Sequence, residues 1–550
     1  MDQTRLFIAI LLSFLLFFLW EFFFVDKEKL NQPKIELSNQ QIAKVTPILK
    51  DELIDNKQHG SEDVALLSKK HRKITINTPL YSVQISEKGA VFTSFILKKY
   101  RQHIELNSPL LEMLSTEPNA ETITLAFQNK TSHDFDLNNS FFLSKLPSDS
   151  IDIYETPEEV SFTFVSSSGI VIEKKFTFFP ETYLIKLNVA VKNQSDQTFQ
   201  NNLIVSIQNK GPADKTMYGF EGPSALINDK LTQIKTKKIE TTGPLSGKIK
   251  WIALQDRYFI SCIIPEKPAE AVMQIGVNPQ NILKADYIQP ESIIAPNTQH
   301  GFEYSLYFGP KSMKALAKAN YDLKKAVNFG MFDVIAKPCV WAMNYLYEFI
   351  PNYGIAIIML TVFIKIILWP LGSKSYKSMS EMKKLQPLMA ELREKHKNNK
   401  QKMNQEIMGL YKTYKVNPLG GCLPMVVQIP IFFALYRMLY EAIELRHAPF
   451  FGWINDLAAP DRLFNFDFSI PFMQPPYGIP VLTIIMGGTM FLQQKMSPPM
   501  GDPSQAKIMM FMPIIFTVIF INFSSGLVLY WLVNNILSIS QQYYIQKKYA

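Results

Sequence analysis

The strongest constraint on this 550-residue chain is a run of 39 residues, 508–546, that contains no charged side chain. An α-helix needs about 20 residues to cross roughly 30 Å of hydrocarbon at about 1.5 Å per residue, so the run is long enough for two crossings. The sequence NFSSG at 522–526 is a turn signal near its middle. We therefore predict two membrane-spanning helices, at 508–523 and 526–546.

Other apolar segments indicate four more spans. Three of them are residues 351–371, 418–442 and 476–494. The fourth is the N-terminus, which is apolar from residue 6 to residue 25 except for Glu21 and lacks a small-x-small cleavage site. We expect residues 1–25 to be an uncleaved signal anchor, with a cleaved signal peptide as the alternative. Residues 26–71 are rich in Asn, Gln and charge, which predicts a flexible tether.

Charge decides which way the six spans face. Residues 372–417 carry 11 basic and 4 acidic side chains, a net charge of +7, whereas residues 26–330 carry 36 and 34 and are nearly neutral. Positively charged loops stay in the cytoplasm. The predicted cytoplasmic segments are 372–417, 495–507 and 547–550, and the acidic loop 443–475 lies outside. Both termini are then cytoplasmic, and the region after the first span is exported, into the periplasm if the cell is Gram-negative.

The exported region alternates apolar and polar residues with a period of two, which is typical of half-buried strands. The clearest run is Tyr183, Ile185, Leu187, Val189 and Val191. We predict a large antiparallel β-sandwich over residues 72–310. Its histidines lack metal-ligand spacing and no nucleophile or phosphate motif occurs, so we expect no enzyme, no metal and no cofactor. A sugar-binding groove is the alternative.

Residues 311–350 change to helical spacing, with Trp and Tyr side chains among lysines. This pattern favours an amphipathic helical region lying along the outer membrane interface, broken or kinked at Pro338. A linker helix packed on the sandwich is the alternative.

Lys365 is the most informative single residue of the predicted bundle, because it lies within the apolar sequence VFIKIILWP. A charge in a membrane segment is costly and usually faces a water-filled cavity or a partner. We favour a hydrated cavity, with snorkelling to the interface and an ion pair as alternatives. Polar residues of the spans would line such a cavity: Thr361, Gln428, Asn522, Ser525, Asn534 and Asn535. The fifth span, 508–523, is only ~24 Å long and predicts local thinning of the bilayer.

The basic segment 372–417 shows two apolar sets at helical spacing, separated by Asn398-Asn399. This predicts a cytoplasmic helical hairpin. Flexible methionines and positive charge favour contact with apolar substrates, anionic lipids or ribosomal RNA, and a simply solvated helix pair is the alternative. The predicted contact residues are Met379, Met382, Lys383, Lys384 and Met389.

Several motifs in matching order carry a resemblance to a known family. They are NPLGGC at 417–422, QIPIFFALY at 428–436, ELRHAPF at 444–450, QKMSP at 494–498, FMPIIFTVIF at 511–520 and SSGLVLYW at 524–531. With these motifs the chain closely resembles the Gram-negative type of YidC membrane-protein insertases, within the YidC/Oxa/Alb family. The resemblance covers the whole chain.

The resemblance implies a polytopic α-helical inner-membrane protein with a five-helix insertase core and a mutarotase-like periplasmic supersandwich. It implies that nascent inner-membrane proteins enter a hydrophilic groove, and that Gln428, Ile429, Pro430 and Trp531 lie where members contact substrate. Lys365 replaces the arginine usual in that groove, which keeps the charge but loses the bidentate fork. The implied partners are the Sec translocon (SecYEG and SecDF), the ribosome, the signal-recognition machinery and membrane lipids. The competing function is an ion-coupled membrane transporter.

Overall fold

A computed structural model describes residues 72–549 apart from 106, 116–119, 129–135, 212–218, 398, 415, 417–422 and 498–502. The predicted signal anchor 1–25 and tether 26–71 lie outside the described residues. The chain divides into two compact units. One includes Leu385–Lys415 and Pro498–Phe511, and the other comprises His71–Lys384, Val416–Ser497 and Met512–Ala550.

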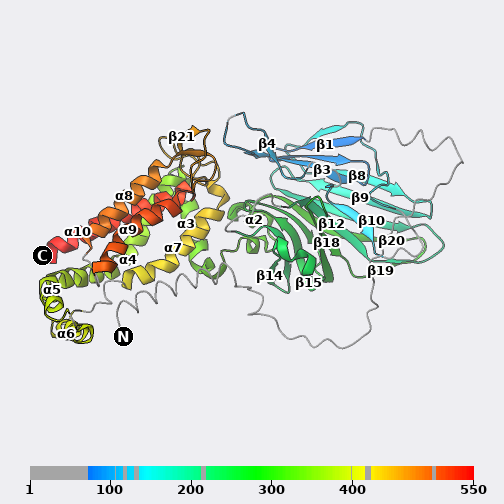
Figure 1. The fold of residues 1–550 in the computed structure, drawn as a ribbon. Helices are drawn as coiled ribbons and strands as arrows, with labels where there is room; N and C mark the ends of the chain where they lie inside the picture. The colour runs from blue at the N-terminus through cyan, green and yellow to red at the C-terminus, as the bar shows by residue number, and fades with distance from the viewer. Residues whose placement is uncertain are drawn as a thin grey trace, which may run out of the picture. The chain divides into compact units, whose positions relative to one another are not determined.

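Strands β1 to β20 build a β-sandwich, which confirms the predicted fold of the exported region (Figure 1). The first ten strands are β1 (Lys73–Asn77), β2 (Tyr81–Ser86), β3 (Val91–Arg101), β4 (Leu110–Glu112), β5 (Thr124–Phe127), β6 (Leu143–Ser144), β7 (Ser150–Asp152), β8 (Glu158–Val165), β9 (Ile170–Phe178) and β10 (Leu184–Asn193). The others are β11 (Phe199–Asn201), β12 (Leu203–Lys210), β13 (Gly222–Ile227), β14 (Lys230–Gln233), β15 (Leu245–Gln255), β16 (Phe259–Pro265), β17 (Glu270–Val277), β18 (Ile282–Ile288), β19 (Ser292–Ile294) and β20 (Thr298–Pro310).

The larger sheet has 13 strands, in the order β5-β12-β18-β17-β15-β16-β20-β10-β9-β8-β6, with β13 and β14 joined beside β15. The smaller sheet has the order β4-β3-β2-β1-β7. Long antiparallel pairs dominate, such as β9 with β10 and β10 with β20, and the β1–β7 pair is parallel. Strand β10 shows why the period-two pattern was informative: Ile185, Leu187, Val189 and Val191 are all buried, while the residues between them are not.

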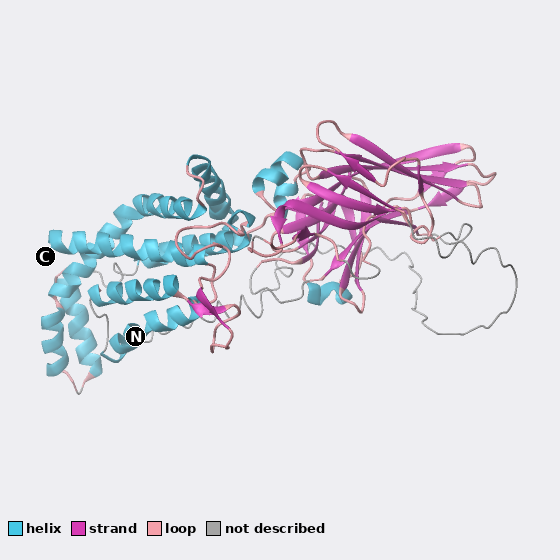
Figure 2. Ribbon diagram, turned by 90° about the horizontal axis from the view of Figure 1, so that it is seen from above, coloured by secondary structure: helices cyan, strands magenta, loops and turns pink. Residues whose placement is uncertain are grey.

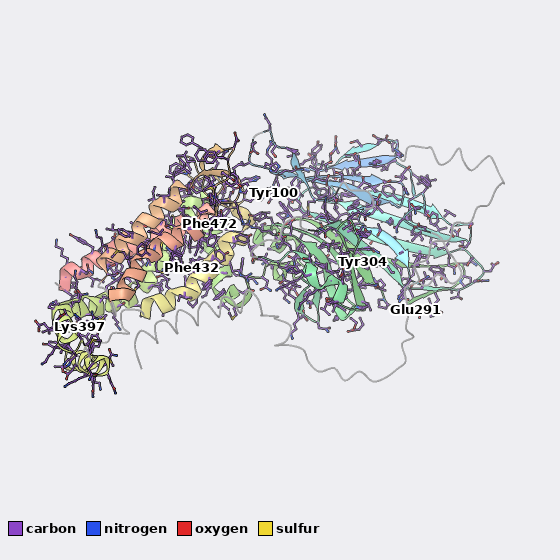
Figure 3. The ribbon with its side chains drawn as sticks, in the orientation of Figure 1. Tyr100, Glu291, Tyr304, Lys397, Phe432 and Phe472 are labelled. Atoms are coloured by element: carbon purple, nitrogen blue, oxygen red, sulfur yellow. The ribbon has the colours of Figure 1, made fainter. Side chains whose placement is uncertain are left out.

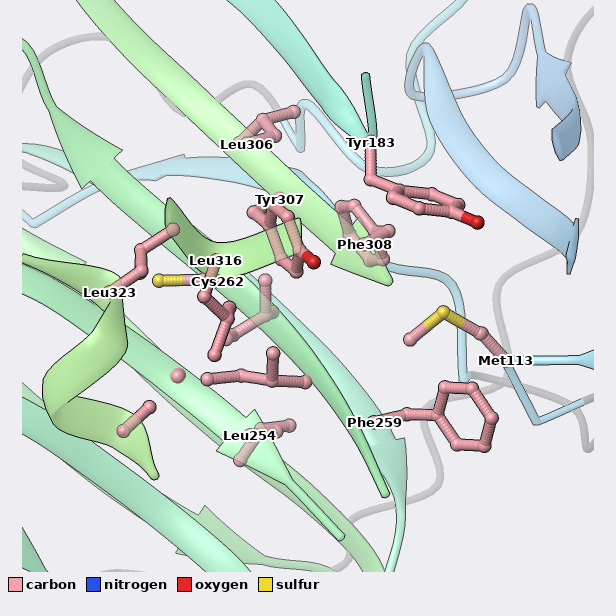
Figure 4. Close-up of a cluster of buried hydrophobic side chains, with 14 of the residues drawn as sticks. Met113, Tyr183, Leu254, Phe259, Cys262, Leu306, Tyr307, Phe308, Leu316 and Leu323 are labelled. Carbon is pink, nitrogen blue, oxygen red and sulfur yellow. The ribbon is translucent and has the colours of Figure 1, made fainter. Parts of the chain in front are cut away.

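The sandwich extends beyond residue 310 into the region predicted to lie at the membrane interface. Helix α2 (Met313–Ala319) and the 3₁₀ turn η3 (Leu323–Ala326) bury Leu316 and Leu323 in the core beside Tyr307, Phe308 and Cys262 (Figure 4). The packed-linker alternative therefore holds for this first half. The second half is η4 (Gly330–Phe332) and α3 (Asp333–Phe349), which buries Val340 but leaves aromatic rings exposed.

The rest of the described chain is mainly helical. Figure 2 draws helices in cyan and strands in magenta. The remaining helices are α4 (Tyr353–Lys384), α5 (Gln386–Lys395), α6 (Lys400–Thr413), α7 (Leu423–Glu441), α8 (Val481–Met496), α9 (Pro503–Phe520) and α10 (Ser525–Tyr549). The short elements are η2 (Thr236–Thr241), η6 (Ile443–Leu445), β21 (Leu463–Phe466) and β22 (Tyr477–Ile479). Helix α10 packs most extensively on α4 and α8, and α3 packs on α4 and α7.

Helix α4 continues through Pro370 to Lys384, well past the predicted end of the span at residue 371. Gly372 leaves room for Gln541 of α10, since a Cβ at position 372 would lie 2.9 Å from the Gln541 Nε2 atom. The Gln541 amide donates to Trp369 O at 3.0 Å. This bond ties α10 to the backbone of α4 directly before Pro370.

By length and composition, one helix among the described residues is long and apolar enough to cross a membrane: α4, with a mean hydropathy of 2.3 over its most apolar window. A shorter apolar helical stretch is Met509–Phe520. Helix α8 begins at Val481, five residues later than the predicted fourth span, because Tyr477–Ile479 pairs with β21 and Pro480 precedes the helix.

Candidate functional site

Lys365 lies in the middle of α4, with its side chain directed toward α10. Its ammonium group donates a hydrogen bond to Ser538 Oγ at 2.7 Å, and Ser538 Oγ donates in turn to Asn534 O at 2.7 Å. Lys365 is partly buried, whereas the following Ile366 and Ile367 are exposed. A lysine ammonium has three N–H donors. The described residues satisfy one of them, and among these residues Lys365 takes part in no ion pair.

A second polar contact joins α7 to the same turn of α10. Gln428 Nε2 donates to Asn534 Oδ1 at 2.7 Å, so Gln428 and Lys365 bind neighbouring positions of one helix. Of the next two residues of α7, Ile429 is partly buried and Pro430 is exposed. The structure therefore brings Gln428 and Lys365 together around Asn534 and leaves Pro430 on the outer surface of α7.

Trp531 connects three helices through its ring. It packs edge-on against Phe432 of α7 at 4.5 Å between ring centroids and lies 5.2 Å from Phe520 of α9 (Phe432 is labelled in Figure 3). Its indole Nε1 is buried and has no hydrogen-bond partner among the described residues. An unpaired buried N–H is costly, and none of the described residues accepts a hydrogen bond from this one.

Two predicted cavity residues lie elsewhere. Thr361 is buried, and its hydroxyl donates to Ile357 O at 2.7 Å, one turn back in its own helix. Asn522 binds the loop between α7 and α8: its Nδ2 donates to Phe472 O at 2.8 Å, and its Oδ1 accepts from Gln474 N at 2.8 Å. Among the described residues, neither side chain is hydrogen-bonded to Lys365, Ser538 or Asn534.

The predicted cytoplasmic hairpin consists of α5 and α6. Asn399 caps α6, with its side chain accepting from Lys402 N at 3.0 Å, and Tyr411 donates to Met389 Sδ at 3.5 Å between the two helices. The three methionines predicted to contact substrate, Met379, Met382 and Met389, are all buried. The two lysines, Lys383 and Lys384, are exposed at the end of α4.

Comparisons with known proteins decide the family. Residues 345–550 match the family described as "60Kd inner membrane protein", and residues 73–342 match "YidC periplasmic domain". A "Membrane protein insertase YidC" of Syntrophus aciditrophicus (strain SB) is 43% identical over 88% of this chain and 86% of its own length. The chain belongs to the YidC family of membrane protein insertases. The resemblance found from the sequence motifs is thereby confirmed.

Two further relatives extend this comparison. The insertase YidC of Pelobacter propionicus (strain DSM 2379 / NBRC 103807 / OttBd1) is 35% identical over 99% of both chains. A crystal structure described as an active YidC insertase with the first transmembrane domain resolved is 19% identical, with a TM-score of 0.38 over 86% of this chain and 93% of that chain.

The YidC-family bundle of this chain is held together by residues of α10 that sequence reasoning largely missed. Gln541 bonds Trp369 O, Gln542 Nε2 donates to Ser497 Oγ at 3.4 Å, and Gln546 Nε2 donates to Met496 O at 3.1 Å. Ser538, the partner of Lys365, belongs to the same set. Their signal was present: a 39-residue uncharged run that still carries polar side chains at 534, 535, 538, 541 and 542 presents one polar helix face.

Proposed function

We propose that this chain inserts nascent inner-membrane proteins through a hydrophilic intramembrane groove beside Lys365, with six spans, both termini in the cytoplasm and the β-sandwich in the periplasm. Family membership supports the activity, and the +7 charge of residues 372–417 supports the orientation. Insertion of this kind requires no catalytic step. The sandwich, which we propose to be mutarotase-like in fold, needs no active site for it.

The observation that carries the proposal is the incomplete hydrogen bonding of Lys365. One of its three N–H groups reaches Ser538, and no carboxylate of the described residues pairs with it. A charged group within a membrane helix needs water or a partner for the remaining donors. Two unit charges ~4 Å apart attract by ~4 kcal/mol at an effective dielectric of 20, compared with ~1 kcal/mol in water. Lys365 therefore attracts acidic residues on the translocated tail of a substrate.

The wall of the groove is formed by α7 and α10. Ile429 and Pro430 offer apolar surface to a substrate helix, Gln428 marks the polar side, and the ring of Trp531 packs behind this surface against Phe432. We propose that Thr361 and Asn522 support the groove from outside it, because Thr361 bonds within α4 and Asn522 bonds the outer loop. The predicted fifth span, 508–523, has 16 residues, or ~24 Å, which favours a thinned bilayer beside the groove.

The hairpin α5–α6 is proposed to receive substrates in the cytoplasm. The exposed Lys383 and Lys384 suit ribosomal RNA and anionic lipid headgroups. Met389 is buried inside the hairpin and becomes a contact only if the hairpin opens, and Met379 and Met382 are likewise buried, on α4. The proposed partners remain the Sec translocon, the ribosome, the signal-recognition machinery and lipids. For the competing transporter function, Lys365 would need a coupled carboxylate, and none of the described ones pairs with it.

Site-specific photocrosslinking tests the groove. A photoreactive amino acid is placed at 365, 429 or 531 of the full chain, and at 363 as the matched control. Phe363 is exposed on α4 and lies ~200° around the helix from Lys365. Ribosome-stalled nascent chains of an inner-membrane protein should crosslink from 365, 429 and 531 and much less from 363. Equal crosslinking from 363 and 365 would contradict a groove on the α10 side of α4.

A further inference from the structure

The connection between α7 and α8 has an unusual distribution of polar and apolar side chains. Two of its carboxylates accept hydrogen bonds from within the protein. Asp461 is 3% exposed and its carboxylate accepts from Trp453 Nε1 and Leu482 N, while Asp456 accepts from His447 N at 3.0 Å and Ala458 N at 2.8 Å. Its phenylalanines point outward. Phe464, Phe468 and Phe472 are 68%, 64% and 81% exposed. A loop surrounded by water would have the opposite arrangement.

The segment carrying these rings is held firmly to the end of α9. Arg462 Nε donates to Pro476 O at 2.8 Å, and its Nη1 donates to Ile521 O at 2.8 Å. Asn522 binds Phe472 O and Gln474 N on the other side of the segment. The rings are therefore presented by a fixed backbone, and little conformational entropy is lost when they bind a partner.

The hairpin β21–β22 contains a local irregularity at Phe464, whose ring is exposed. Its register shifts between Leu463 and Asn465, and Phe464 at the shift has φ +56°, in the left-handed region that bulky residues rarely adopt. Gly478 faces this bulge, and a Cβ at 478 would collide with Phe464 O. The fold thus uses a glycine to keep a strained backbone that exposes Phe464.

We propose that Phe464, Phe468 and Phe472 form a membrane anchor, which we name the phenylalanine anchor, inserted at the boundary between headgroups and acyl chains of the outer leaflet. The inference rests on the proposed function, because it needs the helices to span a bilayer. Aromatic rings prefer this interface. The exposed Asp467, between Phe466 and Phe468, marks the side that stays with the headgroups.

The position of the loop favours lipid, rather than another protein, as the partner of the exposed rings. The loop joins two helix ends directly, and it meets two more: Arg462 binds Ile521 O after α9, and Ser525 N at the start of α10 donates to Ala459 O at 2.8 Å. Four helix ends therefore meet at this loop, at the level where the helices leave the hydrocarbon. Anchoring the loop there holds the outer end of the short helix α9 at the interface, so the lipid must adapt to its length.

Spin labels test the anchor in the full chain. Cys339→Ser and Cys422→Ser remove two native thiols, and buried Cys262 is kept. Single labels are placed through Phe464→Cys and Phe472→Cys, with Phe363→Cys on α4 as the lipid reference and Ile293→Cys, exposed on β19, as the water reference. The protein is reconstituted in nanodiscs of phosphatidylethanolamine and phosphatidylglycerol, and collisions with oxygen and with a water-soluble nickel chelate are compared by power saturation.

We expect labels at 464 and 472 to favour oxygen over nickel, as the label at 363 does. If they favour nickel, as at 293, while 363 favours oxygen, the anchor is wrong and the spanning topology stands. If 363 also favours nickel, the topology fails and the anchor with it. Because a cysteine could disturb the loop, Phe472→Trp provides a milder probe. Its added fluorescence should be quenched by brominated lipid, unlike that of Tyr154→Trp on the sandwich, and equal lack of quenching would overturn the anchor.

Discussion

Two lysines, one in each architecture of the molecule, are buried in opposite ways. Lys174 of β9 is 0% exposed, and its ammonium donates to three backbone carbonyls: Gly89 O at 2.8 Å, Ile123 O at 3.0 Å and Ala90 O at 3.1 Å. Lys365 of α4 has one hydroxyl partner, Ser538. The sandwich has satisfied every donor of Lys174, whereas the described residues of the bundle pair only one donor of Lys365. This contrast indicates a structural role for Lys174 and supports the substrate-binding role proposed for Lys365.

The same contrast runs through the two regions. The sandwich buries apolar side chains on paired strands, and its three carbonyls around Lys174 come from residues with positive φ, namely Gly89, Ala90 and Ile123. In the bundle, apolar side chains such as Phe363 and Ile366 are exposed, while Asn534, Ser538 and Gln541 are buried on α10. Polar contacts hold the helices together, because lipid tails are as apolar as the side chains and no hydrophobic effect drives helices to associate within them.

The largest effect is expected from the cytoplasmic hairpin. Replacing residues 386–413 by a short flexible linker should abolish insertion, because the substrate-receiving surface is lost. The Lys365 site should survive, since α5 and α6 belong to a different compact unit from α4 and α10. Insertion of a reporter protein in depleted cells, at matched protein levels, measures this. Wild-type insertion by the shortened chain would contradict a substrate-receiving role for the hairpin.

Lys174→Met should destabilise the sandwich strongly. It leaves three buried carbonyls without a donor, at about 1–3 kcal/mol for each unsatisfied group, so we expect a loss of at least about 3 kcal/mol. The matched control is Lys175→Met, since Lys175 is a surface residue paired with Glu159 at 3.0 Å. Urea unfolding followed through buried Trp251 compares the variants. Equal stability of the two variants would show that Lys174 is dispensable for the stability of the sandwich. It would contradict the structural role by which Lys174 differs from Lys365.

Charge changes at Lys365 should act selectively on substrates. Lys365→Glu should lower insertion of substrates with acidic translocated tails about tenfold, which corresponds to about 1.4 kcal/mol, and Lys365→Ala should lower it less. Lys365→Arg should retain activity, because the positive charge remains. Substrates with neutral tails serve as the control and should lose little. If Lys365→Glu inserts acidic tails as well as wild type, the attraction model fails.

The smallest expected effect is a pH dependence of sandwich stability. Burial lowers the pKa of Lys174 from its usual 10.5 to about 7. Between these values the unfolded chain binds more protons than the folded one, so stability rises with pH, by up to about 1 kcal/mol from pH 7 to pH 8. Lys174→Met should abolish this rise, and Lys175→Met should keep it. A rise that persists in Lys174→Met would have to come from another group.

The sequence was a better guide to the architecture than to the individual side-chain contacts. Periodicity was sufficient for the sandwich, because alternation in strands such as β10 directly records which side is buried. It also placed Lys174 on the inward side with Ile172 and Phe176, a signal that was not used. The helical contacts were harder, because an apolar composition does not say which helices meet. Ser538 as the partner of Lys365 follows only from the packing of α4 on α10.

Other differences have the same origin. Leu316 and Leu323 have the spacing of an interfacial helix, but the sandwich offers an apolar surface for them and they pack there. Met379, Met382 and Met389 looked suited to variable substrates, yet the helical packing buries them. The sequence predicted Asn522 as a cavity residue, but its side-chain amide donates a hydrogen bond to Phe472 O, 50 residues earlier in the chain. Each outcome depends on a tertiary partner that local sequence cannot reveal.

Site-resolved amine labelling tests the central contrast most directly. The intact protein in nanodiscs is treated with a small acetylating reagent, and modification of each lysine is quantified by mass spectrometry over time. We predict that Lys365 is modified at least about tenfold faster than Lys174, because a group whose donors are all satisfied reacts only when the fold opens. Exposed Lys175 gives the upper reference rate. If Lys365 is as protected as Lys174, its ammonium is closed off from water and substrate, and the proposed groove is contradicted.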